Sequence, residues 1–181
     1  MELIGEKVRL RPVDETDMDD LYLWWYDPEF NGEYSGDYPK SRPEVEALFR
    51  GASSYIILGR SDSRKIGFIS YYTVRQDYPY LFEIGYRIKP SERRKGYTTE
   101  AAGLLLGHIF ATRREVERIE SVTDVGNVAS QRVLEKNGFK REGVLKKRFY
   151  LNGRFRDEYM YGLLREDWEL RRPSSQREKR S

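Results

Sequence analysis

The sequence has no cysteine, and this absence excludes disulfide bonds, thiolate catalysis and zinc sites built from cysteine. Its single histidine, His108, argues against a histidine-rich metal site or a Ser-His-Asp triad, so we expect no bound metal. No run of about twenty apolar residues is present, and we expect no transmembrane helix. No apolar segment follows the charged first eleven residues, so we expect no signal peptide and a cytoplasmic location.

Positive charge is concentrated at the C-terminal end of the chain. Residues 171–181 contain five Lys or Arg residues and one acidic residue, a net charge of +4, whereas the whole chain carries +3. The first 170 residues therefore carry −1, which argues against the basic face that nucleic-acid-binding domains usually need. We do not expect the body of the protein to bind nucleic acid. The tail is either a solvated end or a segment that contacts RNA or an acidic partner.

A basic stretch joins a predicted strand, 81–88, to a predicted helix, 97–112; it reads Arg93-Arg94-Lys95-Gly96-Tyr97-Thr98. The start of a helix offers unpaired backbone N–H groups and the positive end of the helix dipole. Gly96 has no Cβ, so a ligand can approach the backbone closely. The stretch therefore predicts a site for a phosphate or pyrophosphate, and a solvated surface turn is the alternative.

The segment 24–38 is rich in aromatic and acidic residues. It holds six aromatic side chains, four acids and no Lys or Arg, and its two glycines indicate a loop. Carboxylates and aromatic faces together are suited to hold a cation, so the segment predicts a cation-binding pocket. The alternative is a helix end that is anchored in the core, with solvated acids between the anchors.

Hydrophobic periodicity predicts seven strands and four helices. The expected strands are 7–11, 54–58, 66–74, 81–88, 119–122, 140–150 and 155–164, and the expected helices are 15–25, 41–50, 97–112 and 127–136. The strand, helix and strand around the basic stretch indicate one parallel crossover in an otherwise antiparallel sheet. We therefore expect an α+β fold, with a mixed, mostly antiparallel sheet of six to seven strands and about four flanking helices. Residues 1–168 would form this single domain, and residues 169–181 a basic, disordered tail.

The helix predicted over 97–112 carries an apolar stripe. Gly103 and Gly107 each cost about 1 kcal/mol against alanine within a helix, so their presence indicates close packing against a neighbour, which we expect to be the sheet. His108 lies along the apolar face, and we expect it to be structural rather than catalytic.

The order of elements, with these motifs in these places, resembles the GNAT superfamily of acetyl-CoA-dependent N-acetyltransferases over about residues 5–168. The basic stretch resembles the family signature Arg/Gln-x-x-Gly-x-Gly/Ala, with Thr98 in place of the usual small residue. Residues 126–139, from Gly126-Asn127 to Gly138-Phe139, resemble a later helix of the family. The segments 8–12, 142–145 and 150–153 are similar to the RimJ/RimL-type branch, which acetylates ribosomal-protein N-termini, polyamines and other amino compounds.

The resemblance implies a site for acetyl-CoA as co-substrate. The pyrophosphate would lie on the basic stretch, and the pantetheine arm would follow strand 81–88 as far as Ile88. Asn127 would bond that arm or the acceptor, although it is also placed to cap a helix, and Arg132 would reach the outer phosphate. The implied cofactor-binding residues are Ile88, Arg93, Arg94, Lys95, Gly96, Tyr97, Thr98, Asn127 and Arg132.

The resemblance also suggests catalytic residues. Direct attack of the acceptor on acetyl-CoA is expected, because no cysteine can carry the acetyl group. Glu83 is the candidate base, or else a structural or acceptor-binding carboxylate. Ser130 would position the sulfur or relay a proton, and Tyr150 is a spare candidate. The RimL-type glutamate before Tyr-Leu-Asn-Gly is Phe149 here, which weakens an assignment to ribosomal proteins.

The leading hypothesis is thus an N-acetyltransferase that acts on a primary amine, either a protein N-terminal α-amine or a small cationic amine. Trp25, Glu29 and Tyr34, from the segment 24–38, would bind this acceptor. The alternative is a catalytically silent module that binds or senses acyl-CoA. We expect a monomer or a homodimer.

Overall fold

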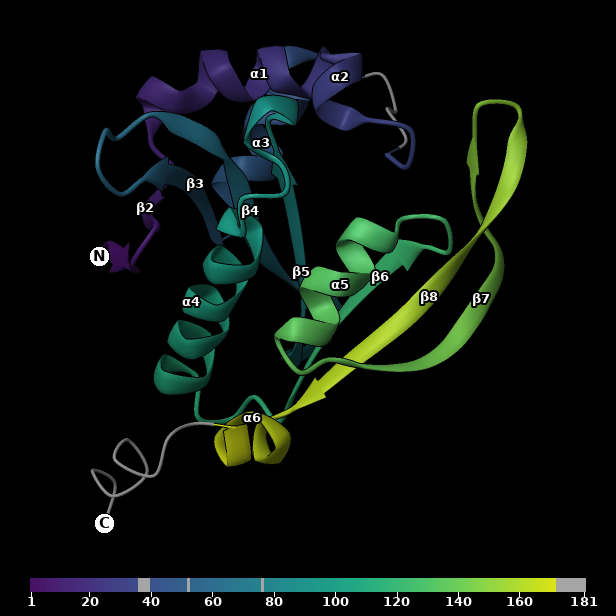
Figure 1. Cartoon of the computed structure of the whole chain (residues 1–181). Coiled ribbons are helices and arrows are strands. Elements are labelled where there is room, and N and C mark those ends of the chain that lie inside the picture. The colour runs from purple at the N-terminus through teal and green to yellow at the C-terminus, as the bar shows by residue number, and fades with distance from the viewer. Residues whose placement is uncertain (36–39, 52, 76, 172–181) are drawn as a thin grey trace.

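The computed structural model describes residues 1–35, 40–51, 53–75 and 77–171. Its centre is one sheet with the strand order β1-β2-β3-β4-β5-β6-β8-β7 (Figure 1). The strands are β1 (Leu3–Ile4), β2 (Val8–Pro12), β3 (Ser53–Gly59), β4 (Lys65–Arg75), β5 (Tyr78–Ile88), β6 (Arg118–Asp124), β7 (Lys140–Leu151) and β8 (Arg154–Leu164). Neighbouring strands are antiparallel except β5 and β6, which are parallel. The predicted α+β fold with one parallel crossover is confirmed.

The sheet has eight strands instead of the six to seven expected. The additional strand, β1, consists of Leu3 and Ile4, which pair with Leu10 and Arg9 of β2. Two residues cannot display the alternation by which a strand is recognised in a sequence. This strand therefore depends on its partner and leaves no pattern of its own.

The described residues form six α-helices, more than the four or so expected. They are α1 (Met18–Tyr26), α2 (Pro28–Asn31), α3 (Arg42–Gly51), α4 (Tyr97–Thr112), α5 (Val128–Lys136) and α6 (Arg165–Arg171), with two short 3₁₀ turns, η1 (Glu15–Asp17) and η2 (Pro90–Glu92). Helix α2 lies within the segment predicted as a loop. Helix α6 includes residues 169–171, which were expected to begin a disordered tail; residues 172–181 lie outside the described part. No helix among the described residues is long and apolar enough to cross a membrane.

Helices α4 and α5 lie against each other and cover one face of the sheet (Figure 1). The core beneath them is buried and apolar, and α4 contributes Ala101, Ala102, Leu105, Leu106, Ile109 and Phe110 to it. The two glycines of α4 do not face the sheet as we expected. A Cβ on Gly103 would lie 3.1 Å from Oδ1 of Asn137 after α5, and one on Gly107 would lie 3.7 Å from the Trp168 ring of α6.

The opposite face of the sheet is covered by a second core. Helices α1, α2 and α3 bury it against β3 and β4, through residues such as Ile56, Leu58 and Phe68. Described residues of β5, β6 and β8 make no contribution to this core. The apolar core on this face is therefore confined to β3 and β4, while β5, β6 and β8 present polar side chains such as Glu83, Glu120 and Glu158 on it.

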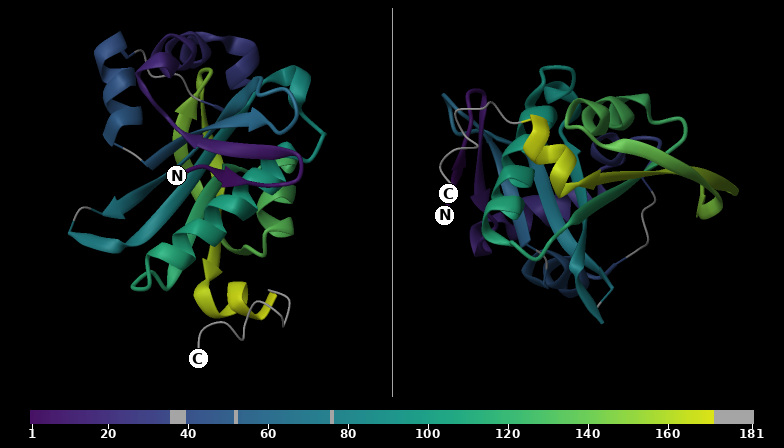
Figure 2. Two further views of the ribbon diagram at one scale, coloured as in Figure 1. Left: turned by 90° about the vertical axis from the view of Figure 1, so that its left-hand side faces the viewer. Right: turned by 90° about the horizontal axis from the view of Figure 1, so that it is seen from below.

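The β7–β8 hairpin extends beyond the rest of the sheet (Figure 2). Its turn contains Asn152 and Gly153, both with positive φ values, of 50° and 79°. This is the conformation that an Asn-Gly turn favours, and it confirms the predicted hairpin.

Candidate active site

Strands β5 and β6 separate in the middle of the sheet. Their parallel pairing comprises only Leu81 with Arg118, Phe82 with Ile119, and Glu83 with Glu120. Both strands continue, to Ile88 and to Asp124, but they diverge (Figure 1). The last link is the hydroxyl of Ser121, which donates to the carbonyl oxygen of Ile84 at 3.0 Å. We call the opening between residues 84–88 and 121–124 the seam.

A loop rich in free N–H groups lies at the far end of β5. It contains η2 and then two residues with positive φ, Arg94 at 65° and Gly96 at 83°. Gly96 is the N-cap of α4 and offers no side-chain cap. No acceptor among the described residues receives the backbone N–H groups of residues 94–99. Such a concave set of N–H groups at the start of a 16-residue helix is suited to bind a phosphate.

Charge around this loop is organised by Glu92, which is buried. Its carboxylate accepts from Arg64 at 3.0 Å and from Lys95 at 3.1 Å. These cations, Arg64 first, lower the pKa of Glu92 to about 2, so the cluster stays ionised at neutral pH. In contrast, the side chains of Arg94 and Arg132 make no ion pair or hydrogen bond with a described residue, and both are exposed. Both therefore remain available for a phosphate, as does Lys7, whose Nζ would lie 3.5 Å from a Cβ on Gly96.

Arg93 has a role that differs from the cofactor contact predicted for it. Its guanidinium donates to the carbonyl oxygens of Glu29 at 2.9 Å and Phe30 at 3.2 Å. Its backbone N–H donates to the carbonyl of Pro90 at 3.2 Å. Arg93 therefore anchors α2 to the loop before α4, and its backbone N–H is not free to bind a ligand.

Two predicted residues, Asn127 and Ser130, lie beside Tyr86 on the α5 side of the seam. The side chain of Asn127 accepts from the N–H of Ser130 at 3.1 Å, so Asn127 is the N-cap of α5. The hydroxyl of Ser130 lies 3.0 Å from that of Tyr86, which comes from the divergent part of β5. Burial raises the pKa of Tyr86, which keeps the phenol protonated. Sequence reasoning missed Tyr86; its only signal was its place three residues after Glu83, on the opposite face of the strand.

Glu83 lies at the base of the seam, on the face opposite to α4 and α5. Its carboxylate accepts a hydrogen bond from the hydroxyl of Tyr72 on β4 at 2.6 Å. Burial raises the pKa of Glu83; the bond from Tyr72 opposes this effect, and the nearby Glu120 carboxylate adds to it. A carboxylate with a raised pKa is a better base than one in water. Tyr72 was also missed, because only the register of β4 against β5 reveals it.

The three predicted acceptor residues lie at different places around this face. The guanidinium carbon of Arg87 lies over the Trp25 ring, 5.0 Å from the ring centroid. The buried indole N–H of Trp25 has no acceptor among the described residues. Glu29 contributes its carbonyl to Arg93 while its side chain is exposed. Tyr34 lies under Arg156 at 5.4 Å.

Tyr34 also reaches the open end of the seam. A Cβ on Gly126, in the loop between β6 and α5, would lie 3.0 Å from Cε1 of Tyr34. The segment 24–38 is thus brought to the mouth of the seam by Tyr34, although its residues 36–38 lie outside the described part.

Tyr150 is not part of this group. It is 55% exposed near the tip of the β7–β8 hairpin, and its ring packs edge-on against Phe155. Among the described residues, no hydrogen bond joins it to Glu83 or Ser130. The structure therefore offers Tyr86, not Tyr150, as the tyrosine beside Ser130.

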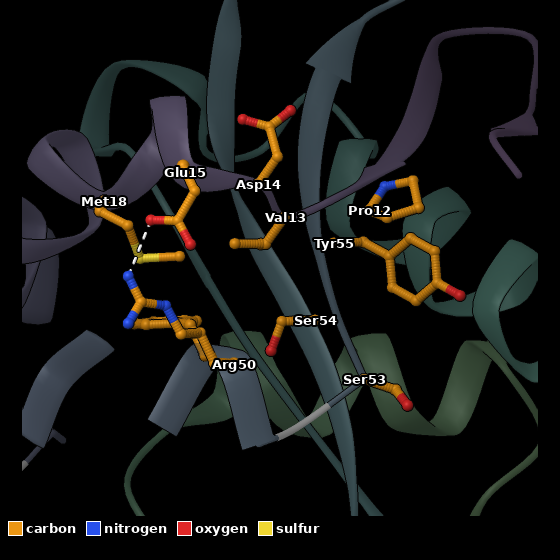
Figure 3. A pocket seen from close by; sticks show the side chains of 10 residues that line it. Pro12, Val13, Asp14, Glu15, Met18, Arg50, Ser53, Ser54 and Tyr55 are labelled. Carbon is orange, nitrogen blue, oxygen red and sulfur yellow. Dashed lines mark hydrogen bonds and ion pairs between the residues drawn. The ribbon is translucent and has the colours of Figure 1, made fainter. Parts of the chain in front are cut away.

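A cavity of about 400 Å³ lies apart from these groups, between η1, α3 and β3 (Figure 3). Val13, Met18 and Phe49 form its apolar part, and an ion pair of 2.7 Å between Glu15 and Arg50 spans it. None of the predicted site residues lines this cavity. This cavity is therefore separate from the predicted site.

The comparison with known proteins decides the family. Residues 7–140 match a family model described as an acetyltransferase (GNAT) domain. The chain belongs to the GNAT acetyltransferase family. The GNAT resemblance inferred from the motifs is thereby confirmed, and the protein is an acyltransferase of this family.

Relatives of this GNAT protein extend over most of its length. It is 34% identical over 169 residues to YoaA of Bacillus subtilis, an uncharacterized N-acetyltransferase, with 88% of this chain and 94% of YoaA covered. The structure of RimL, a ribosomal L7/L12 alpha-N-protein acetyltransferase, in complex with coenzyme A has a TM-score of 0.77 at 24% identity, covering 91% of this chain and 98% of RimL. The structure of Mycobacterium smegmatis RimJ in complex with CoA-disulfide has a TM-score of 0.76 at 23% identity, covering 94% of this chain and 87% of RimJ. At these identities, RimL and RimJ show a shared fold.

GNAT enzymes use acetyl-CoA, and the residues of this member fit such a ligand. The free N–H groups of residues 94–99 and the cations of Arg94 and Arg132 suit a polyphosphate. The unpaired edge of β5 in the seam suits an extended amide-containing arm, which can bond to it as another strand would. No group of three or more potential metal ligands occurs among the described residues.

Proposed function

We propose that this protein transfers the acetyl group of acetyl-CoA to a primary amine by direct attack. The donor enters the seam from the side of α4 and α5, and the amine approaches from the opposite face. One observation supports this proposal: the pairing of β5 with β6 ends at Glu83, whose side chain lies on the face opposite to α4, while the loop of free N–H groups at residues 94–99 begins α4 on the other face. Donor and acceptor can then meet between the two strands.

The donor is held mainly by backbone groups. In this proposal, the N–H groups of residues 94–98 bind the pyrophosphate, and Lys95 supplies charge while it remains paired with Glu92. Arg132 reaches the outer phosphate. Ile88, which packs at the edge of the main core, provides an apolar contact for the pantetheine arm.

Glu83 and the Tyr86–Ser130 pair divide the proton transfers. The amine must be neutral to attack, and Glu83 accepts its proton directly or through water. The departing thiolate needs a proton, and the hydroxyls of Ser130 and Tyr86 lie on the donor side, 3.0 Å apart, to supply one. The raised pKa of Glu83 suits a base at neutral pH, and the raised pKa of Tyr86 keeps its phenol protonated, so that it can donate a hydrogen bond.

The test is the release of free thiol from acetyl-CoA by the purified protein, over a panel of primary amines that includes N-terminal peptides and small cationic amines. We expect thiol release that depends on the added amine, with acetylated product found by mass spectrometry. Glu83→Gln should slow it by about 10²-fold or more. Binding of CoA without turnover on any amine would contradict the proposal and favour a silent acyl-CoA-binding module.

A further inference from the structure

The part of the sheet that faces the acceptor carries acidic side chains around an apolar strip. Side chains two residues apart on a strand share a face, so Glu120, Val122 and Asp124 of β6 lie on the same face. Glu83 is the register partner of Glu120, so it lies on this face as well.

Strand β8 extends this surface. Its Met160 and Glu158 are the register partners of Val122 and Asp124, and residues opposite each other in an antiparallel pair share a face. We call the surface formed by Glu83, Glu120, Val122, Glu158 and Met160 the acidic floor. Its carboxylates are separated by the cross-strand pair of Val122 and Met160.

The acidic side chains on and beside this floor differ in how close their nearest cation lies. Asp124, beside it, is fully buried and paired with Arg156 at 2.7 Å, and Glu120 faces Arg118 at 3.4 Å. Glu158 has only Arg148 of β7, whose Nε lies 4.0 Å away and whose side chain is 62% exposed.

Glu83 has no ion pair with a described residue and accepts only from the hydroxyl of Tyr72. Burial raises the pKa of Glu158, with Arg148 acting against this and the carboxylates of Glu83 and Asp124 adding to it. The floor therefore holds two carboxylates, Glu83 and Glu158, that share one weakly placed cation, Arg148, which is exposed and lies 4.0 Å from Glu158. An isolated anion that is withdrawn from water is costly, and a cationic ligand would relieve this cost.

We propose that Glu158 is a specificity-determining residue that binds a second cationic group of the acceptor, so that diamines are preferred over matched monoamines. This inference rests on the proposed function. One amine of such an acceptor would lie at Glu83, where acetyl transfer occurs, and the other at Glu158. The methylene chain between them would lie on Val122 and Met160, which are both partly buried and accept apolar contact.

The test compares 1,4-diaminobutane and 1,6-diaminohexane with butylamine and hexylamine as acceptors. We expect the wild-type protein to favour the diamines by about tenfold in kcat/KM, beyond the twofold that two equivalent amines give. Glu158→Gln should reduce this preference to about twofold, because it should lower kcat/KM for the diamines much more than for the monoamines. A lower rate for monoamines and diamines alike would indicate a structural role and overturn the inference.

Asp157→Asn is the matched control. Asp157 is the neighbour of Glu158 on β8, faces the other side of the strand and is paired with Lys146 at 2.9 Å. The substitution removes the same charge from the same strand, and the diamine preference should persist.

Calorimetric titration of the diamines in the presence of CoA separates this inference from the proposed function. Diamine binding that weakens about tenfold in Glu158→Gln supports the role of Glu158 even if no amine is acetylated, an outcome that would remove the proposed function alone. Equal diamine binding by Glu158→Gln and the wild type, or an unchanged preference in kinetics, would overturn the inference while acetyl transfer stands.

Discussion

Glu83 acquires its chemistry from neighbours on other strands. The hydroxyl that bonds to it belongs to Tyr72 on β4, and the carboxylate that raises its pKa belongs to Glu120 on β6. Neither is near Glu83 in the sequence. The choice of Glu83 as a candidate came from the family pattern, but its environment follows only from the register of three strands.

At the residue scale, we predict that the pH profile depends on Glu83. The rate rises with pH as the carboxylate loses its proton, and because burial raises the pKa of Glu83, this limb should lie above the ordinary glutamate value of about 4.3. In Glu83→Gln, kcat/KM should fall by about 10²- to 10⁴-fold and this limb should vanish, leaving only the titration of the acceptor amine.

The control for this measurement is Glu117→Gln, since the Glu117 side chain is 74% exposed and remote from the seam. Its profile should match the wild type. An unaltered acidic limb in Glu83→Gln would show that another group is the base.

The contacts of some single residues could not be predicted from the sequence. Asn127 and Ser130, chosen from the family motif, lie together at the start of α5, and Arg93, also predicted to bind the cofactor, donates to the carbonyls of α2. Tyr86 was overlooked, because its contact with Ser130 joins residues 44 positions apart. Side-chain roles that depend on such distant partners leave no local pattern in a sequence.

At the scale of elements, the loop before α4 carries a group of free backbone N–H groups that suits an anion. Positive φ values at Arg94 and Gly96 turn successive N–H groups toward one side, and α4 adds its own free N–H groups. Glu92 holds Arg64 and Lys95 in place beneath them. The proposed phosphate site would therefore need little rearrangement to bind its ligand.

We predict that Gly96→Glu weakens CoA binding by about 100-fold, or ~2.7 kcal/mol, because it adds bulk and negative charge where the phosphates approach. Gly153→Glu is the matched control, since Gly153 also has a positive φ, of 79°, and a Cβ placed on it would meet no described atom within 4 Å. Both substitutions strain the backbone, but only the first should change the CoA affinity measured by calorimetry. Similar losses from both would mean that strain, and not the phosphate site, is responsible.

The elements that could be predicted are the long ones with a clear period, such as α4 and the β7–β8 hairpin. Short elements were missed for a common reason. Helix α6 is placed by Arg165, which donates to the carbonyls of Phe110, Arg113 and Val116, and α2 is held by Arg93. These elements depend on contacts with other parts of the fold, and tertiary contact overrides weak local preference.

At the scale of the whole molecule, the order of strands and helices was sufficient to predict the fold class and the one parallel pair in the sheet. The acceptor side was less accessible to prediction. The side chains proposed to serve it come from α1, the segment after α2, β4, β5 and β8, and they lie at separate places around one face of the sheet. A site that is assembled from one or two residues of many elements has no continuous motif.

We predict that removal of residues 172–181 leaves the folded body and its catalysis intact. Arg171 should be retained, because it donates to the carbonyl of Lys136 at 2.9 Å. The truncation removes a net charge of +3, so the remaining chain has a net charge of zero. The truncated protein should therefore elute from a cation exchanger at lower salt. For small amines, kcat/KM should stay within about twofold of the full-length value. A larger loss would show that the tail contributes to the acceptor site.

The separation of β5 from β6 also means that this sheet is interrupted at its centre rather than only at its edges. On the side that faces β6, alternate amides of residues 84–88 have no strand partner in the described part of the chain, so they are open to exchange with solvent deuterium. A donor that fills the gap would complete the ladder and slow that exchange. Occupancy by CoA can therefore be followed in the backbone itself, before any acceptor is known.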